Sequence, residues 1–293
     1  PFDGRDRPVV YLPGPAASRL PTVRRAVADS LGGRPFLEAL GLGEPDVVAE
    51  VLQVILPSYD ELDITQLEPA RHAADLEDVV RALDSAAGRS EELFERLHRT
   101  PFLIGENAAT GEQRLMPPPA LYQRSKELEV YFDGNPDSWF AGDRYGPWLV
   151  QLREMGVRQA VEIRARTPGD LGYVIITVEF GRSERGLGGF DPDAEIDGLD
   201  FALRHPSHAR SEYVWNVLLA PNRRLVAGVV ETSVLASFGD ASQQDARSAI
   251  AVIAEREAWL PGRDGTFRRP GELSLDDLPA TYAREEGLAR ALN

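Results

Sequence analysis

The sequence contains no cysteine, a single lysine (Lys126) and no long apolar run. Without cysteine the chain can form no disulfide, no thiolate nucleophile and no cysteine-ligated zinc site. No apolar stretch approaches the roughly 20 residues that a membrane-spanning helix needs, so we expect no membrane partner. The first residues do not follow the pattern of a secretory signal, and we therefore expect a cytoplasmic location. Because the chain begins without Met, we also expect it to be an internal segment of a longer protein.

Basic residues are scarce relative to acidic ones. The 293 residues include 47 acidic and 32 basic side chains, which gives a net charge of −15. Nucleic acids and anionic membranes are bound by concentrated Lys and Arg, so the charge disfavours both as partners. Two tight arginine pairs, Arg223-Arg224 and Arg268-Arg269, leave open a nucleic-acid-contacting segment of a defence-associated effector. We expect these pairs to meet nearby acids such as Glu272 instead.

Apolar residues recur at helical spacing in several stretches. The clearest set predicts an amphipathic helix and consists of Leu76, Val79, Val80 and Leu83. The other face of this helix carries charged residues, Asp75 among them, and is expected to face solvent. Another helix is expected within residues 21–31, with Val23, Val27 and Leu31 on one face.

Strand patterns lie between these helical stretches. Residues 173–180 are β-branched and aromatic and predict a strand, whereas residues 245–257 predict a helix. The repeated order of strand, helices and hairpin predicts an α+β fold: several small modules of short hairpins or sheets packed on helices, with no single large parallel sheet. We expect a mostly helical module over 1–60, helices plus a hairpin over 61–165, and a second α+β module over 166–293.

One stretch near the C-terminal end predicts a small β-hairpin followed by a docking loop. Its structural motif consists of Trp259, Leu260, Pro261, Asp264, Gly265 and Pro270. Asp-Gly is a tight-turn dipeptide, because glycine adopts the positive φ that a two-residue turn requires. Pro270 is expected to end the return strand, and Trp259 is expected to be buried.

Residues 100–121 form a looser copy of this motif. Both stretches place an aromatic residue and Leu before a turn with glycine, then Arg, Pro and Leu. A two-stranded hairpin is marginally stable alone and needs a surface that covers its apolar face. We therefore predict that Phe102 packs near Leu97 and Trp259 near Ile253, in equivalent arrangements.

Three stretches resemble ligand sites but depart from the required patterns. Gly105 to Gly111 has five residues between its glycines, followed by Glu112 where a phosphate loop has Lys, and is interpreted as a hairpin turn. Residues 184–189 are glycine-rich but lack the dinucleotide-binding spacing, which favours a flexible connection. Residues 191–198 fit the opening of a calcium loop, yet Arg204 stands where the bidentate Glu is needed. We interpret those acids as the lead into a helix N-terminus.

Two histidines give the one candidate for a metal-dependent enzyme. His205, His208 and Glu212 stand at i, i+3 and i+7, a spacing that places three possible zinc ligands on one helix face. Pro206 and Ser207 indicate that a helix begins between the histidines, which favours two surface histidines at its entry. We therefore expect no catalytic residue, cofactor-binding residue or metal ligand in this chain.

Three blocks of sequence together resemble the central region of large bacterial proteins of the sacsin-like group. The blocks include residues 10–13, 20–25 and 35–46; residues 198–206 and 213–218; and residues 259–267, 269–270 and 273–279. The third block is the most specific. The resemblance covers most of the chain and is loose between residues 164 and 190.

The resemblance implies that this chain is a non-catalytic part of a larger protein. Proteins of the group carry a histidine-kinase-like ATPase domain near the N-terminus, with an Asn helix and Asp-x-Gly-x-Gly motifs that this sequence lacks. ATP and Mg²⁺ are thus expected only in a domain outside this chain. The implied role is a scaffold or interaction segment of an ATP-dependent, chaperone-like bacterial protein, with other domains of the parent chain and protein clients as partners.

Overall fold

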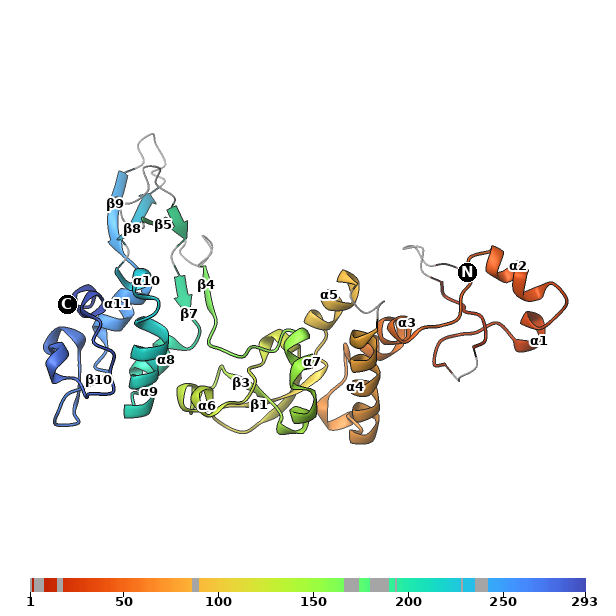
Figure 1. The fold of residues 1–293 in the computed structure, drawn as a ribbon, viewed down its shortest axis with the longest axis horizontal. Coiled ribbons are helices and arrows are strands. Elements are labelled where there is room, and N and C mark those ends of the chain that lie inside the picture. The colour runs from red at the N-terminus through yellow and green to blue at the C-terminus, as the bar shows by residue number, and fades with distance from the viewer. Residues whose placement is uncertain are drawn as a thin grey trace. The chain divides into compact units, whose positions relative to one another are not determined.

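The computed structural model of the chain describes residues 2, 8–14, 18–85, 90–165, 174–179, 190–192, 194–227, 229–234 and 242–293 (Figure 1). The chain divides into two compact units that interleave in sequence. The first consists of Pro1–Glu106, Gly111–Gln123 and Trp139–Gln159, and the second of Asn107–Thr110, Arg124–Ser138 and Ala160–Asn293.

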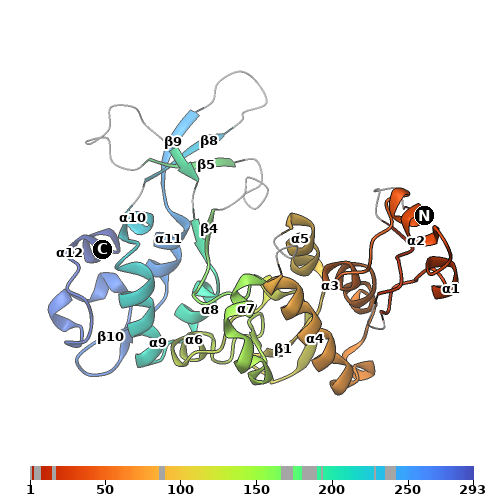
Figure 2. The ribbon, with the colours of Figure 1, turned by 45° about the vertical axis from the view of Figure 1, so that its right-hand side comes forward.

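The first unit is mostly helical and holds one small sheet (Figure 2). Its α-helices are α1 (Arg25–Ala28), α2 (Gly33–Ala39), α3 (Val47–Glu50), α4 (Pro69–Asp84), α5 (Glu91–Arg99) and α7 (Leu149–Glu154). After α3 the chain continues as a π-helix (Val51–Ile55) and a 3-10 helix (Leu56–Tyr59). Strands β1 (Leu103–Asn107), β2 (Gln113–Met116) and β3 (Trp139–Ala141) form a sheet of order β2-β1-β3.

The expected amphipathic stripe on α4 faces the core of this unit. Leu76, Val79 and Leu83 are buried there with Leu97 of α5 and Phe102 at the start of the hairpin. Ser90 caps α5 by accepting a hydrogen bond from the backbone of the third helical residue, as Ser does at many helix N-termini. The α4 helix therefore forms as the sequence pattern predicts.

The same core also includes residues from before position 60. Val51 and Ile55 of the π-helix are buried in one cluster with Leu76 and Val79 of α4. The boundary expected between the modules 1–60 and 61–165 thus falls inside a single packed core, whereas the second compact unit takes up the chain from Ala160.

The second unit is α+β. Its helices are α6 (Lys126–Phe132), α8 (Leu199–Arg204), α9 (His208–Tyr213), α10 (Arg223–Ala227), α11 (Ala249–Arg256) and α12 (Glu286–Ala291), and a π-helix (Val214–Leu219) continues α9. Four strands pair antiparallel in the order β6-β5-β8-β9: β5 (Val174–Glu179), β6 (Phe190–Pro192), β8 (Val229–Val234) and β9 (Ser242–Arg247). Strands β4 (Ile163–Ala165) and β7 (Ala194–Ile196) form a separate antiparallel pair.

These elements establish the α+β class, with short antiparallel sheets and no large parallel sheet among the described residues. The strand expected over 173–180 is present as β5. The helix expected over 245–257 begins only at Ala249, where Ser248 caps α11, because residues 242–247 pair with β8 instead. Tertiary pairing of the backbone decides that boundary.

The two hairpins are built differently. Strands β1 and β2 belong to a three-stranded sheet, whereas β10 (Leu260–Pro261) and β11 (Phe267–Arg268) pair only with each other. The two hairpins therefore differ at the level of the sheet, while the equivalent packing of Phe102 near Leu97 and of Trp259 near Ile253 stays a prediction. The first hairpin has a third strand beside it, and the second depends on packing against helices.

Candidate functional site

The Trp259 hairpin forms where expected, but its turn is longer than the expected two residues, because Pro261 pairs with Phe267 and Gly262 N donates to the carbonyl of Thr266 at 2.9 Å, which leaves a loop of residues 263–265. Leu260 pairs with Arg268, and Gly265 adopts a φ of 77°, in the region that favours glycine. Asp264 closes the turn, because its Oδ1 accepts hydrogen bonds from Thr266 N at 3.1 Å and Thr266 Oγ1 at 2.7 Å. Buried Pro270 then begins a 3-10 helix, so it ends the return strand as expected.

Trp259 anchors this hairpin to the helices. Its side chain is 0% exposed, and its indole N–H donates to the carbonyl of Ala254 in α11 at 2.8 Å. The ring lies beside that of Trp215, with 6.2 Å between centroids. Trp215 in turn donates to the carbonyl of Ala283 at 2.9 Å. Trp259 is thus a structural anchor within the second unit rather than an exposed binding residue.

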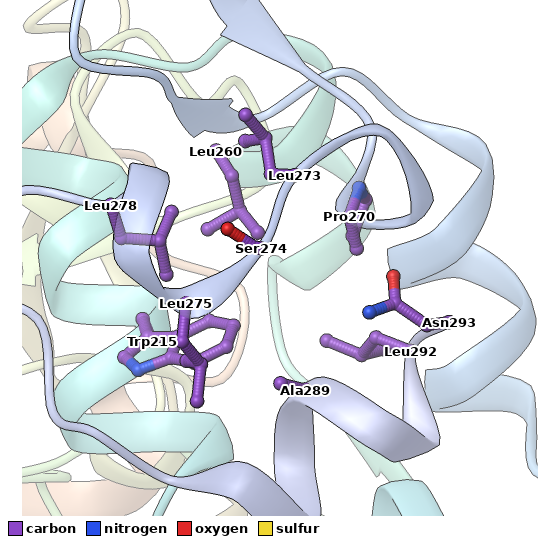
Figure 3. A pocket seen from close by; sticks show the side chains of 10 residues that line it. All are labelled: Trp215, Leu260, Pro270, Leu273, Ser274, Leu275, Leu278, Ala289, Leu292 and Asn293. Carbon is purple, nitrogen blue, oxygen red and sulfur yellow. The ribbon is translucent and has the colours of Figure 1, made fainter.

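A small apolar pocket lies beside Trp215. Figure 3 shows the side chains that line it, which come from the hairpin, the docking loop and the last helix, among them Leu260, Leu275 and Leu292. The cavity volume is about 10 Å³. That volume is near the lower limit for one water molecule, so the pocket as it stands does not accommodate a small-molecule ligand.

The histidines of the zinc candidate face different aromatic neighbours. His205 stacks on Phe201 with 4.2 Å between ring centroids, and its Nδ1 lies 3.1 Å from the carbonyl oxygen of Phe201. His208 lies beside Phe267 of β11, at 5.2 Å between centroids. Ser207 caps α9, so the helix begins between the two histidines. Among the described residues, no three His, Cys, Asp or Glu side chains are grouped so that they could hold a metal ion.

The glycine stretch 105–111 covers the end of β1 and the hairpin turn that follows it, which agrees with the interpretation as a hairpin. Ile104 pairs with Leu115, Gly111 has a φ of 70°, and Asn107 Oδ1 accepts the backbone N–H of Ala109 at 3.0 Å. The glycine-rich residues 184–189 lie outside the described residues. In the acidic stretch, Asp193 is also outside them, and Glu195 forms an ion pair with Arg164 across the β4–β7 pair.

Members of both arginine pairs meet acids. Arg223 lies 3.0 Å from Glu285, and Arg268 lies 2.5 Å from Asp264 within its own hairpin. The expected pairing with Glu272 involves the backbone N–H of Arg269, which donates to Glu272 Oε2 at 3.2 Å. These contacts hold loops and helix ends, and they do not gather the arginines into a groove for phosphates.

Sequence reasoning missed a chain of hydrogen bonds through the first core. The Tyr59 hydroxyl donates to Asp75 Oδ2 at 3.1 Å, and its oxygen lies 3.0 Å from His72 Nδ1. On the other side of the ring, His72 Nε2 lies 2.9 Å from the Tyr145 hydroxyl, whose oxygen accepts Ile104 N–H at 2.7 Å. Asp75, Tyr59, His72 and Tyr145 are all buried.

Only one direction of donation satisfies every member of this chain. The Tyr59 proton is used on Asp75, so His72 Nδ1 must carry the proton that Tyr59 accepts. His72 Nε2 then accepts the proton of Tyr145. In the reverse direction the Tyr145 proton and one lone pair of Asp75 would be buried without partners, which is costly. The network therefore fixes the neutral His72 tautomer.

The charged groups of the network are also paired. Arg19 donates to Asp75 Oδ1 at 2.5 Å, and Arg71 lies 3.5 Å from Oδ2, so the buried carboxylate is compensated. The hydrogen bond to Asp75 raises the pKa of Arg19. Burial, aided by the positive charge of Arg144, lowers the pKa of His72 to about 4. This network stabilises the core, and its buried groups offer no open face to a substrate.

The expectation that Asp75 faces solvent is therefore wrong, since its side chain is 0% exposed. The signal was present in the sequence, because His72, Asp75, Leu76 and Val79 follow the same i, i+3, i+4, i+7 spacing as the apolar stripe. A charged residue in such a stripe can be buried when an oppositely charged partner compensates it, and the sequence pattern does not show where that partner is. Arg19, which is 56 positions away in sequence, is the partner.

Arg210 is a second buried group that sequence reasoning missed. Its side chain donates to the carbonyls of Val130 at 3.2 Å and Asp133 at 2.5 Å, at the C-terminal end of α6, and to that of His205. Burial lowers its pKa. The last carbonyls of a helix have no partner within the helix. Arg210 supplies that partner and holds segment 124–138 in the second unit.

Apolar side chains are exposed on α1 and α2. Val27 is 51% exposed, Leu31 108%, Phe36 64% and Leu40 48%, and α2 has no buried residue. The expected helix within 21–31 is only the short α1, and Val27 and Leu31 point away from the core. We refer to residues 18–46, which contain α1 and α2, as the α1–α2 lobe.

No family model, curated protein or solved structure matches this chain. Of the helices in the described ranges, none has the length and apolar character required to cross a membrane.

Proposed function

We propose that this chain is a non-catalytic scaffold or interaction segment of a larger ATP-dependent, chaperone-like bacterial protein in the cytoplasm. The observation that carries the proposal is the α1–α2 lobe, where Leu31 and Phe36 expose most of their apolar surface on a short helical hairpin. Clustered apolar side chains on a protein surface typically mark contacts with other proteins. The sequence resemblance adds the parent protein and its ATPase domain.

The polar chemistry of the described residues agrees with a non-catalytic role. His72, Tyr59 and Tyr145 are buried and use their polar atoms on one another, while His205 and His208 lie against aromatic rings. Catalytic acids and bases need reach to a substrate proton. In this proposal, ATP and Mg²⁺ bind a domain outside the chain, and this segment contacts partner domains or protein clients.

The test uses the purified chain and a thermally unfolded client protein. We expect the chain to reduce aggregation of the client, measured by light scattering, and to bind no ATP–Mg²⁺ by calorimetry. Replacing Leu31 and Phe36 with Ser should weaken the effect on aggregation, whereas Val150→Ser, at a similarly exposed position on α7, should not. ATP hydrolysis by the chain, or no difference between the variants and the wild type, would overturn the proposal.

A further inference from the structure

The α1–α2 lobe presents its apolar side chains from a defined backbone. Gly32 adopts a φ of 74°, Phe36 N donates to the carbonyl of Gly32 at 3.1 Å, and Gly33 N donates to that of Ser30 at 2.8 Å. A Cβ at Gly33 would lie 2.2 Å from the carbonyl oxygen of Val27, so the two helices meet in a turn that only glycine allows. The side chains of Leu31 and Phe36 are therefore held outward by a tight turn.

The spacing of these side chains suits a flat protein contact. Phe36 lies in α2 and Leu40 follows its last turn four residues later, so these two side chains lie on one side of that helix. Val27 lies in α1, whereas Leu31 lies in the turn between α1 and α2. Helix α2 buries none of its residues within this chain. Amphipathic helices in folded proteins bury their apolar stripe against another element, and no element among the described residues buries α2.

Charge distinguishes this part of the chain from the rest. The first 46 residues contain six arginines and six acidic residues, so the net charge of −15 lies entirely in residues 47–293. Within the lobe, Arg34 lies 2.8 Å from Glu44 and 4.0 Å from Glu38. Two copies of a chain with this net charge repel each other through most of their surface. The neutral, apolar lobe is where that repulsion is weakest.

We infer that the occupant of this surface is a second copy of the same chain, in a two-fold contact of one α1–α2 lobe with the other. A two-fold contact uses the same patch on both copies, so the patch must be complementary to itself. The lobe meets this condition in both respects, since it is apolar at Leu31 and Phe36 and balanced in charge. The inference rests on the proposed function, because the proposed function depends on the surface of the α1–α2 lobe and the inference names the partner of that surface.

The charges of the two copies predict the direction in which salt changes the affinity of this dimer. The contact itself is apolar, whereas the bodies that it brings together are both acidic. Added salt shortens the screening length from about 30 Å at about 0.01 M to about 8 Å at about 0.15 M. Salt therefore weakens the repulsion between the bodies and should tighten the dimer, the opposite of what salt does to a contact formed by ion pairs.

The first experiment measures the mass of the purified chain by sedimentation equilibrium over a range of concentrations, at low and physiological salt. We expect a monomer–dimer equilibrium that tightens with salt. The double variant Leu31→Ser, Phe36→Ser should raise the dissociation constant at least about tenfold, since each buried large apolar side chain contributes on that scale. Val150→Ser, which removes an exposed apolar side chain outside the lobe, should leave it unchanged.

The absence of cysteine allows a second, direct readout. In the variant Leu31→Cys the introduced thiol is the only one in the chain. A two-fold contact centred on the lobe brings the two thiols together, so mild oxidation should give a disulfide-linked dimer rapidly and at low protein concentration. The matched variant Val150→Cys should cross-link much more slowly. Equal rates for the two variants, or a monomer at every concentration and salt, would overturn the inference.

These outcomes separate the inference from the proposed function. If the chain is monomeric and its effect on client aggregation still depends on Leu31 and Phe36, the inferred self-association is contradicted and the proposed interaction role stands. If the chain forms a dimer that requires these side chains but has no effect on clients, the proposed function is contradicted and the inferred self-association stands. Circular dichroism of each variant shows whether it is folded, so a loss of dimer in an unfolded variant is not counted as support.

Discussion

The hydroxyl of Tyr145 donates to Nε2 of His72 across 2.9 Å, inside a core where both side chains are almost completely buried. This bond links α4 to the segment after β3 and closes the chain that runs from Asp75 to β1. It also leaves His72 no room for a second proton, because Nε2 has to act as an acceptor. The stability of the first unit should therefore depend on pH.

We predict that stability falls as the pH drops from about 6.5 to about 4. The pKa of His72 is about 4 in the folded chain and near 6.5 in an unfolded one. The unfolded state binds a proton first in this window, so the contribution of His72 is complete above about pH 6.5 and lost towards pH 4. The difference corresponds to roughly 3 kcal/mol. Urea unfolding at several pH values measures it.

The control for this prediction is His72→Gln, which can donate and accept through its amide but does not titrate. The pH dependence between about 4 and 6.5 should shrink in this variant, while the general loss of stability from carboxylate protonation remains. An unchanged slope in His72→Gln would show that another group causes the dependence.

Removal of one hydroxyl from the network should also be measurable. Tyr145→Phe leaves both the Ile104 N–H and His72 Nε2 buried without partners. Each unsatisfied buried group costs about 1–3 kcal/mol, so we expect a loss of roughly 2–6 kcal/mol in the free energy of unfolding. Tyr122→Phe, another buried tyrosine of the first unit, gives the comparison for loss of a hydroxyl elsewhere. Equal effects of the two changes would argue against a special role for the network.

Arg210 should determine whether segment 124–138 stays attached to the second unit. Arg210→Met keeps much of the side-chain volume but removes the donors to the carbonyls of Val130 and Asp133. Hydrogen bonds from charged groups contribute about 1.5–3 kcal/mol each, so we expect a loss of roughly 3 kcal/mol or more. Hydrogen exchange should increase first in α6. Exchange that stays at the wild-type rate in α6 would contradict this view, and Arg204→Met on the exposed surface is the control.

The Trp259 anchor should dominate the stability of the second unit. Trp259→Ala removes a fully buried side chain and its bond to Ala254, and should cost roughly 3–5 kcal/mol. Val252→Ala, on the exposed side of α11, should cost less than about 1 kcal/mol. Thermal melting followed by the fluorescence of Trp215, with the melting of the first unit measured separately, should show that the second unit unfolds at the lower temperature. Unchanged melting of Trp259→Ala would remove the basis for calling it an anchor.

The hairpin turn gives a smaller, purely conformational effect. A Cβ at Gly265 would have no neighbour closer than His208 Nε2 at 3.8 Å, so a side chain fits in space. The φ of 77° is nevertheless a conformation that β-branched residues rarely adopt. Gly265→Val should therefore cost on the order of 1 kcal/mol or more, whereas Gly265→Asn should cost less because Asn tolerates this region. Equal costs for Val and Asn, measured by urea unfolding, would exclude φ strain as the cause.

Local sequence determined those features that depend on neighbouring residues. The stripe of Leu76, Val79 and Leu83 on α4, the cap at Ser90 and the Asp264-Gly265 turn follow from helical spacing, side-chain hydrogen bonding and glycine conformation. The α+β class follows from the alternation of such signals. Each of these features forms within a few residues, so the pattern alone contains enough information.

Tertiary structure decided where distant groups meet. Asp75 is buried because Arg19 reaches it, Arg210 is buried because the end of α6 lacks partners, and Leu31 is exposed because α1 stops after one turn. The pairing of β9 with β8 likewise overrides the helix expected for residues 245–247. For Asp75 and Arg210 the free energy comes from a partner far away in sequence, and a local pattern contains no information about that partner's position.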